Sequence, residues 1–257
     1  MAGPRLELDT RSADAIDGRH LRAAAFHEVR LQYVREIALD RVSPAARALV
    51  VGSGRGVLPA GLAGLGLKVT GVDPSAAATK LARESVPGVD FVTAPSEELP
   101  FPGESFDLVY CADTFEITGD LDGVLGEVAR VLRPGGVLVY DTVNRTVPAR
   151  VVYLGAFQGV PFTRIMPPGR YAAARLRPPG EVRAALAAHG LSGGQVCGFR
   201  PASIGRLVSA VLRRRRGLLT DEQVGPLTGF VLDPDGPPVV TYLGWASKAG
   251  MERLTDR

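Results

Sequence analysis

The sequence predicts an α/β fold in which a largely parallel sheet carries helices on both faces. Short apolar runs alternate with segments of helical periodicity through most of the 257 residues, which is the pattern of a parallel sheet. The first two of these runs end in Gly52 and Asp73, residue types that favour a turn after a strand. Hydrophobic residues make up 46% of the chain, enough to build one large core.

The expected elements follow in order along the chain. A first helix covers residues 20–39, where apolar residues recur at helical spacing, and Ser43-Pro44 ends it. Apolar runs predict seven strands, at 48–51, 68–72, 90–93, 106–111, 137–143, 195–199 and 239–246. Helical patterns predict further helices at 57–65, 76–84, 121–132, 181–189 and 204–215.

Two segments fall outside this rhythm. Residues 1–18 are polar and are expected to form a loose tail, so residues 1–40 comprise a tail and a helix that contributes to a ligand site. Residues 41–257 are expected to form a single domain. Within it, residues 146–179 contain aromatics, prolines and arginines without a clean period. We expect them to be an insertion over the edge of the sheet where ligands bind.

Composition and charge exclude several classes of protein. The net charge is +3 and much of the excess lies in four consecutive arginines at 213–216, whereas a nucleic-acid binder usually has a broader basic face. Cys111 and Cys197 lack the spacing of a metal site. The N-terminus lacks the apolar core of a signal peptide, and no apolar stretch reaches the roughly 20 residues needed to span a bilayer. We therefore expect a soluble, cytoplasmic protein without a nucleic-acid partner.

A glycine-rich turn is the central motif, and it reads Val50-Val51-Gly52-Ser53-Gly54-Arg55-Gly56. Glycine permits positive φ and lets the backbone pass close to a ligand. Asp73 ends the next expected strand, where a carboxylate can accept hydrogen bonds from the two hydroxyls of a ribose. The dinucleotide fingerprint needs its third glycine one residue after Gly56. The turn therefore fits a nucleoside ligand without a pyrophosphate better than it fits a dinucleotide.

Several stretches carry a resemblance to the class I S-adenosylmethionine (SAM)-dependent methyltransferases. They are Leu49-Val50-Val51-Gly52-Ser53-Gly54-Arg55-Gly56, Val69-Thr70-Gly71-Val72-Asp73, Phe106-Asp107-Leu108-Val109-Tyr110-Cys111 and Val131-Leu132-Arg133-Pro134-Gly135-Gly136. Three more places resemble, more narrowly, the ubiquinone-biosynthesis O-methyltransferases, namely Val29-Arg30-Leu31, Thr142-Val143-Asn144-Arg145-Thr146 and Met166-Pro167-Pro168-Gly169. The resemblance, from about Phe26 to Phe199, implies a Rossmann-like, seven-stranded class I methyltransferase sheet with helices on both faces and a lid insertion at about 146–179.

The resemblance assigns cofactor-binding roles by position. Arg30 would hold the methionine carboxylate of SAM, for which a guanidinium is suited because it binds carboxylates through two hydrogen bonds. Asp73 would bind the ribose, and the backbone of the glycine turn would face the amino-acid part. Gly52, Ser53 and Gly54 are the residues of that turn. Ser96 and Glu97 would lie beside the adenine, and Ala112 would contact the cofactor through its backbone.

Catalytic roles are expected after the fourth strand. Methyl transfer to a phenol needs help with removal of its proton, because the pKa of a phenol is near 10. In the family that this chain resembles, the segment reads E-x-x-E-H and is associated with a divalent metal. Here Asp113 and Glu116 keep the two carboxylates, and Ile117 replaces the histidine. A hard cation such as Mg²⁺ could still use two carboxylates and water, but a ligand is missing, and Asp113 or Glu116 could instead act as the base.

The resemblance implies a SAM-dependent O-methyltransferase that acts on a hydroxylated aromatic or quinol-like small molecule. Apolar residues in the 146–179 insertion and the basic run at 213–216 also predict a peripheral contact with a membrane surface. Three alternatives stay open at this point: a C- or N-methyltransferase of a secondary metabolite, a nicotinamide-dependent oxidoreductase, and a non-catalytic protein with the SAM-binding fold.

Overall fold

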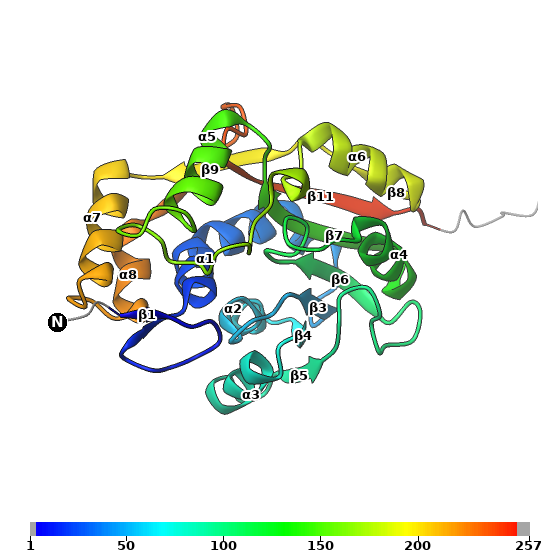
Figure 1. Ribbon diagram of the computed structural model, residues 1–257. Helices are drawn as coiled ribbons and strands as arrows, with labels where there is room; N and C mark the ends of the chain where they lie inside the picture. Colours follow the sequence, from blue (N-terminus) through cyan, green and yellow to red (C-terminus); the bar gives the residue numbers. More distant parts are fainter. Residues whose placement is uncertain (1–3, 251–257) are drawn as a thin grey trace, which may run out of the picture.

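A nine-stranded mixed sheet forms the centre of the molecule in a computed structural model that describes residues 4–250 (Figure 1). The strand order is β10-β9-β11-β7-β6-β3-β4-β5, and β8 pairs with β11 beside this path. The pairs among β3 to β7 are all parallel, whereas β11 runs antiparallel to β7, β8 and β9. The fold class expected from the sequence is therefore confirmed.

The seven expected strands all belong to this sheet. They are β3 (Arg47–Val51), β4 (Lys68–Asp73), β5 (Asp90–Thr93), β6 (Phe106–Cys111), β7 (Leu132–Val143), β9 (Cys197–Pro201) and β11 (Thr241–Lys248). The strand number of seven is wrong for this chain, because β8 (Leu191–Gly193) and β10 (Phe230–Asp233) extend the antiparallel end. Strand β8 has one apolar residue in three and so leaves no apolar run in the sequence. Strand β10 has the run Phe230-Val231-Leu232, which is too short to predict a strand by itself.

The expected helices lie within a few residues of their predicted bounds. They are α1 (Gly18–Ile37), α2 (Val57–Gly64), α3 (Ala76–Ser85), α4 (Leu121–Val131), α6 (Pro179–Ala188) and α7 (Ile204–Arg215). Helix α8 (Asp221–Thr228) was not expected, since it has only eight residues and contains Pro226. A short 3-10 turn, η1 (Leu39–Arg41), follows α1.

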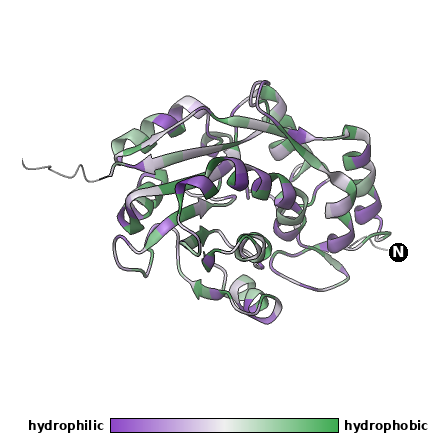
Figure 2. Ribbon diagram, turned by 180° about the vertical axis from the view of Figure 1, so that it is seen from behind, coloured by the Kyte–Doolittle hydropathy of each residue, from purple (hydrophilic) through white to green (hydrophobic). Residues whose placement is uncertain are grey.

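Helices cover both faces of the sheet because successive side chains of each strand point to opposite faces, and both faces are apolar. On β3, Ala48 and Val50 pack with α1 and α2, whereas Leu49 and Val51 pack with α4 and α6. The helices carry hydrophilic and hydrophobic residues side by side, since one side of each faces the sheet and the other faces solvent (Figure 2). No helix within residues 4–250 is long and apolar enough to cross a membrane.

A third apolar cluster lies beside the antiparallel end of the sheet. It joins residues of the 146–179 segment with α7, α8 and the start of the chain, including Tyr153, Ile165, Val211 and Ile16. The 146–179 segment itself holds α5 (Val147–Arg150), a π-helical turn η2 (Val151–Ala156) and a 3-10 turn η3 (Ala173–Arg175). Elements from three distant parts of the sequence therefore form one layer here.

The expectation of a loose tail is wrong for the described residues 4–17. Strand β1 (Arg5–Leu6) pairs in parallel with β2 (Ala15–Ile16), and both residues of β2 are fully buried. Asp17 then caps α1 by accepting a hydrogen bond from the backbone N–H of His20. Two buried apolar residues and a helix cap hold this segment against the rest of the fold.

Candidate functional site

The glycine turn between β3 and α2 has the backbone geometry that its residues predict. Gly52, Gly54 and Gly56 all have positive φ, at 75°, 53° and 87°. A Cβ on Gly52 would lie 2.3 Å from the carbonyl oxygen of Ala112, so no other residue fits there. This close approach joins the ends of β3 and β6 at the edge of the sheet where ligands of open parallel sheets bind.

Asp73 lies at the end of β4 and faces this turn. Its carboxylate is fully buried and accepts hydrogen bonds from the backbone N–H of Gly54 at 2.8 Å and of Ser75 at 2.9 Å. It also pairs with Arg19 of α1, whose Nη2 lies 2.5 Å from Oδ2. The carboxylate is therefore held in place beside the glycine turn.

Two neighbouring cavities contain most of the expected cofactor residues. The larger, of about 490 Å³, is lined by Gly52, Ser96 and Glu97. The second is small, about 20 Å³, and is lined by Arg30, Ser53, Gly54 and Ala112 among others. Because Asp9, Arg19, Gly52 and Asp113 line both, the two form one continuous cleft, hereafter the cofactor cleft.

The lining of the cofactor cleft leaves polar groups for a ligand. The Ser53 hydroxyl is buried and has no hydrogen-bond partner among the described residues. Each oxygen of Glu97 has one donor, Ser96 at 3.0 Å and Thr118 at 2.5 Å, so both side chains are ordered at the rim. A nucleoside with an amino-acid tail, which needs several polar partners along an elongated cleft, fits this lining.

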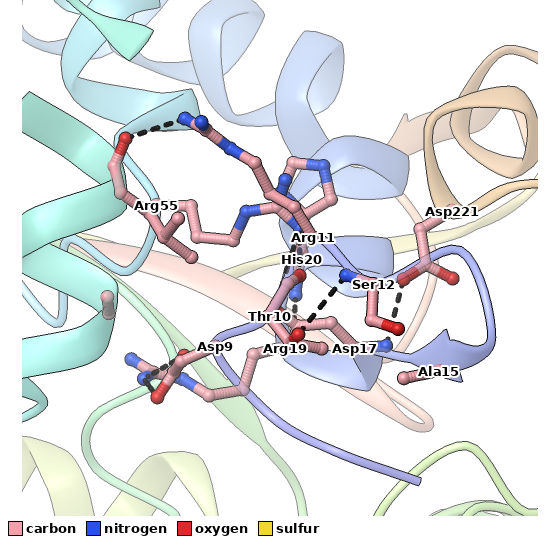
Figure 3. Close-up of polar contacts among 12 residues, drawn as sticks. Asp9, Thr10, Arg11, Ser12, Ala15, Asp17, Arg19, His20, Arg55 and Asp221 are labelled. Carbon is pink, nitrogen blue, oxygen red and sulfur yellow. Dashed lines mark hydrogen bonds and ion pairs between the residues drawn. The ribbon is translucent and has the colours of Figure 1, made fainter. Parts of the chain in front are cut away.

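The start of the chain crosses the cofactor cleft. Asp9 pairs with Arg19 at 2.8 Å, and Arg55 of the glycine turn donates to the carbonyl of Thr10 at 2.9 Å (Figure 3). The backbone N–H of Asp17 donates to Asp221 of α8 at 2.8 Å. Sequence reasoning missed this arrangement, because contacts between residue 9 or 10 and the turn depend on the folded path of the chain.

A buried cluster of charged residues lies against the cofactor cleft, hereafter the charged cluster. It consists of Arg22 and Arg30 of α1, Asp113 and Glu116 after β6, and Asp141 of β7. Arg30 Nη2 lies 2.5 Å from Asp113 Oδ1 and 2.7 Å from Asp141 Oδ2. Arg22 Nη2 lies 2.8 Å from Glu116 Oε1 and 3.0 Å from Asp113 Oδ1. The two expected catalytic carboxylates are thus held by two arginines from one helix.

Burial and the neighbouring charges separate the acidities of two carboxyl groups in this cluster. Burial opposes ionisation of Asp113, but the guanidinium groups of Arg22 and Arg30 outweigh it and hold the pKa below its usual range. Burial, with Asp113 nearby and Arg30 only partly opposing, raises the pKa of Asp141 to about 7. Asp113 therefore stays ionised at neutral pH, whereas Asp141 lies near its midpoint.

The donor set around Asp113 and Glu116 does not fit a divalent cation. Arg22 already binds one oxygen of each carboxylate, and the second oxygen of Glu116 accepts a hydrogen bond from Thr142 at 3.0 Å. Ile117 cannot act as a ligand, as its sequence position already implied. Within residues 4–250, no group of three or more His, Cys, Asp or Glu side chains is placed to hold a metal ion.

An apolar pocket of about 400 Å³ lies on another side of the charged cluster. Its walls come from η2, α7, β9, β10 and Phe26 of α1. The lining includes Tyr153, Phe157, Phe199, Leu207, Val208, Val211, Phe230 and Val240. Two hydroxyls in the lining already donate to backbone carbonyls, Thr163 to Ala156 and Thr241 to Phe199. The pocket is thus suited to an apolar group.

Two aromatic side chains join the apolar pocket to the charged cluster. The ring of Phe26 lies 5.2 Å from the guanidinium carbon of Arg22 and 5.4 Å from that of Arg30. The ring of Tyr153 lies 5.0 Å from that of Arg22. A molecule in the pocket would therefore meet the charged cluster across these rings.

Arg22, Arg19 and Asp141 are site residues that sequence reasoning missed. A signal for Arg22 was present, because Arg22, Phe26 and Arg30 are spaced four residues apart and share one face of α1. Charged residues on an otherwise buried helical face indicate a buried polar cluster. Asp141 carried a weaker signal, as an acidic residue inside an apolar strand.

Comparison with known proteins places the chain in a family. A methyltransferase domain family matches residues 49–140. A ubiquinone biosynthesis O-methyltransferase from Rhizobium etli is 33% identical over 204 residues, which cover 72% of this chain and 81% of the relative. Identity of this level over most of both chains shows that the two proteins belong to one family.

Two solved structures of methyltransferases share the fold of this chain. A SAM-dependent methyltransferase from Thermotoga maritima, described as a possible histamine N-methyltransferase, aligns with a TM-score of 0.60 at 17% identity, over 89% of this chain and 91% of that one. Magnesium protoporphyrin IX methyltransferase from Synechocystis, solved with bound S-adenosylhomocysteine, aligns with a TM-score of 0.55 at 16% identity, over 90% and 84%. The alternatives of a nicotinamide-dependent oxidoreductase and of a non-catalytic protein are set aside, and the chain belongs to the SAM-dependent methyltransferases, in the family of the ubiquinone biosynthesis O-methyltransferases.

Proposed function

We propose that this methyltransferase transfers a methyl group to the hydroxyl of an aromatic or quinol-like small molecule that carries an apolar substituent. The observation that carries this proposal is the position of the charged cluster. Its residues Arg30 and Asp113 line the cofactor cleft, and its Arg22 lies against the rings of Phe26 and Tyr153, which line the apolar pocket. An acceptor whose apolar part fills the pocket would present its polar end to this cluster. The names of the relatives support an O-linked acceptor.

The cofactor roles are proposed from residues that line the cleft and from Asp73, which is hydrogen-bonded to Gly54 but lines neither cavity. Asp73 would accept hydrogen bonds from the ribose hydroxyls, and the backbone of Gly52, Ser53, Gly54 and Ala112 would line the amino-acid part. Ser96 and Glu97 would lie beside the adenine, and Arg30 would face the carboxylate. SAM supplies an electrophilic methyl group on a sulfonium, and the protein positions the acceptor for in-line attack.

Proton removal is proposed for Asp113. It lines the cofactor cleft and keeps 19% of its side chain exposed, whereas the side chain of Glu116 is fully buried. Asp113 would take the proton of the acceptor hydroxyl as the oxygen–methyl bond forms and the carbon–sulfur bond breaks. Glu116, bound by Arg22 and Thr142, would position Arg22.

Two measurements test the proposal. Calorimetric titration of the purified chain with S-adenosylhomocysteine should show binding in the micromolar range, and NADH in parallel should show none. Incubation with methyl-labelled SAM and a panel of 4-alkylphenols and alkylcatechols should then give O-methyl products, identified by mass spectrometry. Labelled methyl groups on ring carbons would exclude O-methylation of these acceptors.

A further inference from the structure

The guanidinium of Arg22 lies between the two carboxylates that would otherwise hold a metal ion. One nitrogen, Nη2, is 2.8 Å from Glu116 Oε1 and 3.0 Å from Asp113 Oδ1. We propose that Arg22 takes the place of a divalent cation, and that this chain transfers methyl groups to hydroxyl acceptors without a metal. The inference rests on the proposed function for its chemistry but not for its geometry.

The surroundings of Arg22 suit a guanidinium and not a hydrated metal ion. The side chain is only 3% exposed and lies against the rings of Phe26, Tyr153 and Tyr171, at 5.2, 5.0 and 5.9 Å. Guanidinium groups are weakly hydrated and stack on aromatic faces. Magnesium instead needs six oxygen ligands at about 2.1 Å and keeps several waters. Around Arg22, three aromatic rings occupy the space that those oxygen ligands would need.

The hydrogen bonds of Arg22 fix its orientation but do not use all five of its N–H donors. Nη1 donates to the hydroxyl of Tyr171 at 3.0 Å, and Nη2 donates to Glu116. Nε is buried and has no acceptor among residues 4–250. An arginine keeps its charge at any physiological pH, so this guanidinium is permanently positive. That charge and the spare N–H are what a developing oxygen anion needs.

The charge has a chemical role in the transfer step. The acceptor loses its proton to the carboxylate of Asp113, and its oxygen bonds to the methyl carbon while the carbon–sulfur bond breaks to leave a neutral thioether. Before the methyl group arrives, negative charge builds on the oxygen. A fixed positive charge in a site of low dielectric stabilises that charge, and no further reactant is required.

The first test measures metal binding and does not depend on turnover. Calorimetric titration of the full-length wild type with MnCl₂ should show no binding at this site. Arg22→Met removes the guanidinium that Asp113 and Glu116 share and leaves Asp113 bound to Arg30 alone, so it should gain Mn²⁺ binding, which Arg22→Met/Glu116→Gln should lose again. Arg206→Met, an exposed arginine on α7, is the matched control and should behave as the wild type does. Micromolar Mn²⁺ binding by the wild type that Glu116→Gln abolishes would overturn the inference.

The second test follows turnover against pH. EDTA should leave the wild-type rate unchanged. Arg22→Met should lower kcat about 100- to 1,000-fold, the range for loss of one oxyanion donor, and should move the acidic limb of the pH–rate profile upward by about one to three units. Arg22→Lys, which keeps the charge, should restore part of the rate and of the profile. A uniform loss of rate with an unchanged profile would show that Arg22 is only structural.

The outcomes separate the two proposals. Binding of S-adenosylhomocysteine by each variant reports that the cofactor cleft is folded. If no hydroxyl acceptor is methylated, the proposed function fails, while the Mn²⁺ titration still decides the inference about Arg22. If Arg22→Met does not fold, the wild-type titration and the EDTA assay decide it.

Discussion

The cofactor cleft and the apolar pocket have similar sizes, about 490 and 400 Å³ for their main cavities, but they are built in different ways. The cleft is lined by strand ends and turns whose residues occur in short motifs, such as Gly52–Gly54. The pocket is lined by side chains from α1, η2, α7, β9 and β10, which are up to two hundred residues apart. A ligand that is the same across a family can be bound by local motifs, whereas the acceptor site depends on long-range packing.

The charged cluster lies between these two regions, and burying it costs free energy of folding. It places two arginines and three carboxyl groups in the interior, where unpaired charge is expensive. The pKa of Asp141, raised to about 7, is the sign of that cost. The following changes test the difference between the regions and the role of the cluster.

The largest effect is expected from Asp141→Asn on stability. Because the folded pKa of Asp141, about 7, lies above its ordinary value of 3.8, ionising this group costs more free energy in the folded state than in the unfolded state. Relative to the variant, the wild type should therefore lose stability progressively as the pH rises from about 4 through 7. Urea unfolding across this range measures the difference.

Asp40→Asn, at an exposed position in η1, serves as the control for that series and should leave the pH dependence as it is. A difference between the wild type and Asp141→Asn that stays constant with pH would contradict the raised pKa.

The next effect concerns the cofactor cleft alone. Asp73→Ala should weaken binding of S-adenosylhomocysteine about 100-fold, because two hydrogen bonds to a charged acceptor are lost. Calorimetric titration measures this, with Asp90→Ala on β5 as an exposed control. The affinity of an alkylphenol for the apolar pocket should not change, and normal affinity for S-adenosylhomocysteine would show that Asp73 does not bind the ribose.

A substitution in the apolar pocket should have the reverse selectivity. Val208→Trp on α7 fills part of the pocket, so KM for 4-octylphenol should rise about tenfold, since each methylene kept out of the pocket forfeits about 0.8 kcal/mol. Binding of S-adenosylhomocysteine should stay as in the wild type. Leu218→Trp, exposed and outside the pocket, is the control. Equal effects of the two tryptophans would mean that the pocket does not hold the acceptor.

The smallest effect is expected at Arg19. Its ion pair with Asp73 occupies the carboxylate that the ribose would use, so Arg19→Met should tighten binding of S-adenosylhomocysteine by about two- to fivefold, the scale of a partly exposed ion pair. Competition titration can resolve such a change. Weaker binding would instead indicate that Arg19 contacts the cofactor directly.

The sequence by itself predicted the parallel sheet, its seven principal strands and the cofactor motifs. These depend on local signals: apolar runs define buried strands, and a glycine turn followed by a strand-end acid is readable within 25 residues. The short elements at the antiparallel end were not predicted, because the apolar run of β10 has only three residues and α8 contains a proline.

Only the tertiary structure decided the acceptor side of the site. The pairing of Arg22 with Asp113 and Glu116 joins residues more than ninety positions apart, and the pocket exists because α7 and β10 pack against η2 and α1. The sequence showed that a metal ligand was missing at Ile117, but not that an arginine lay beside the remaining two carboxylates. The cofactor motifs consist of residues that are neighbours in the sequence, whereas the partners of a buried charge depend on how distant segments pack.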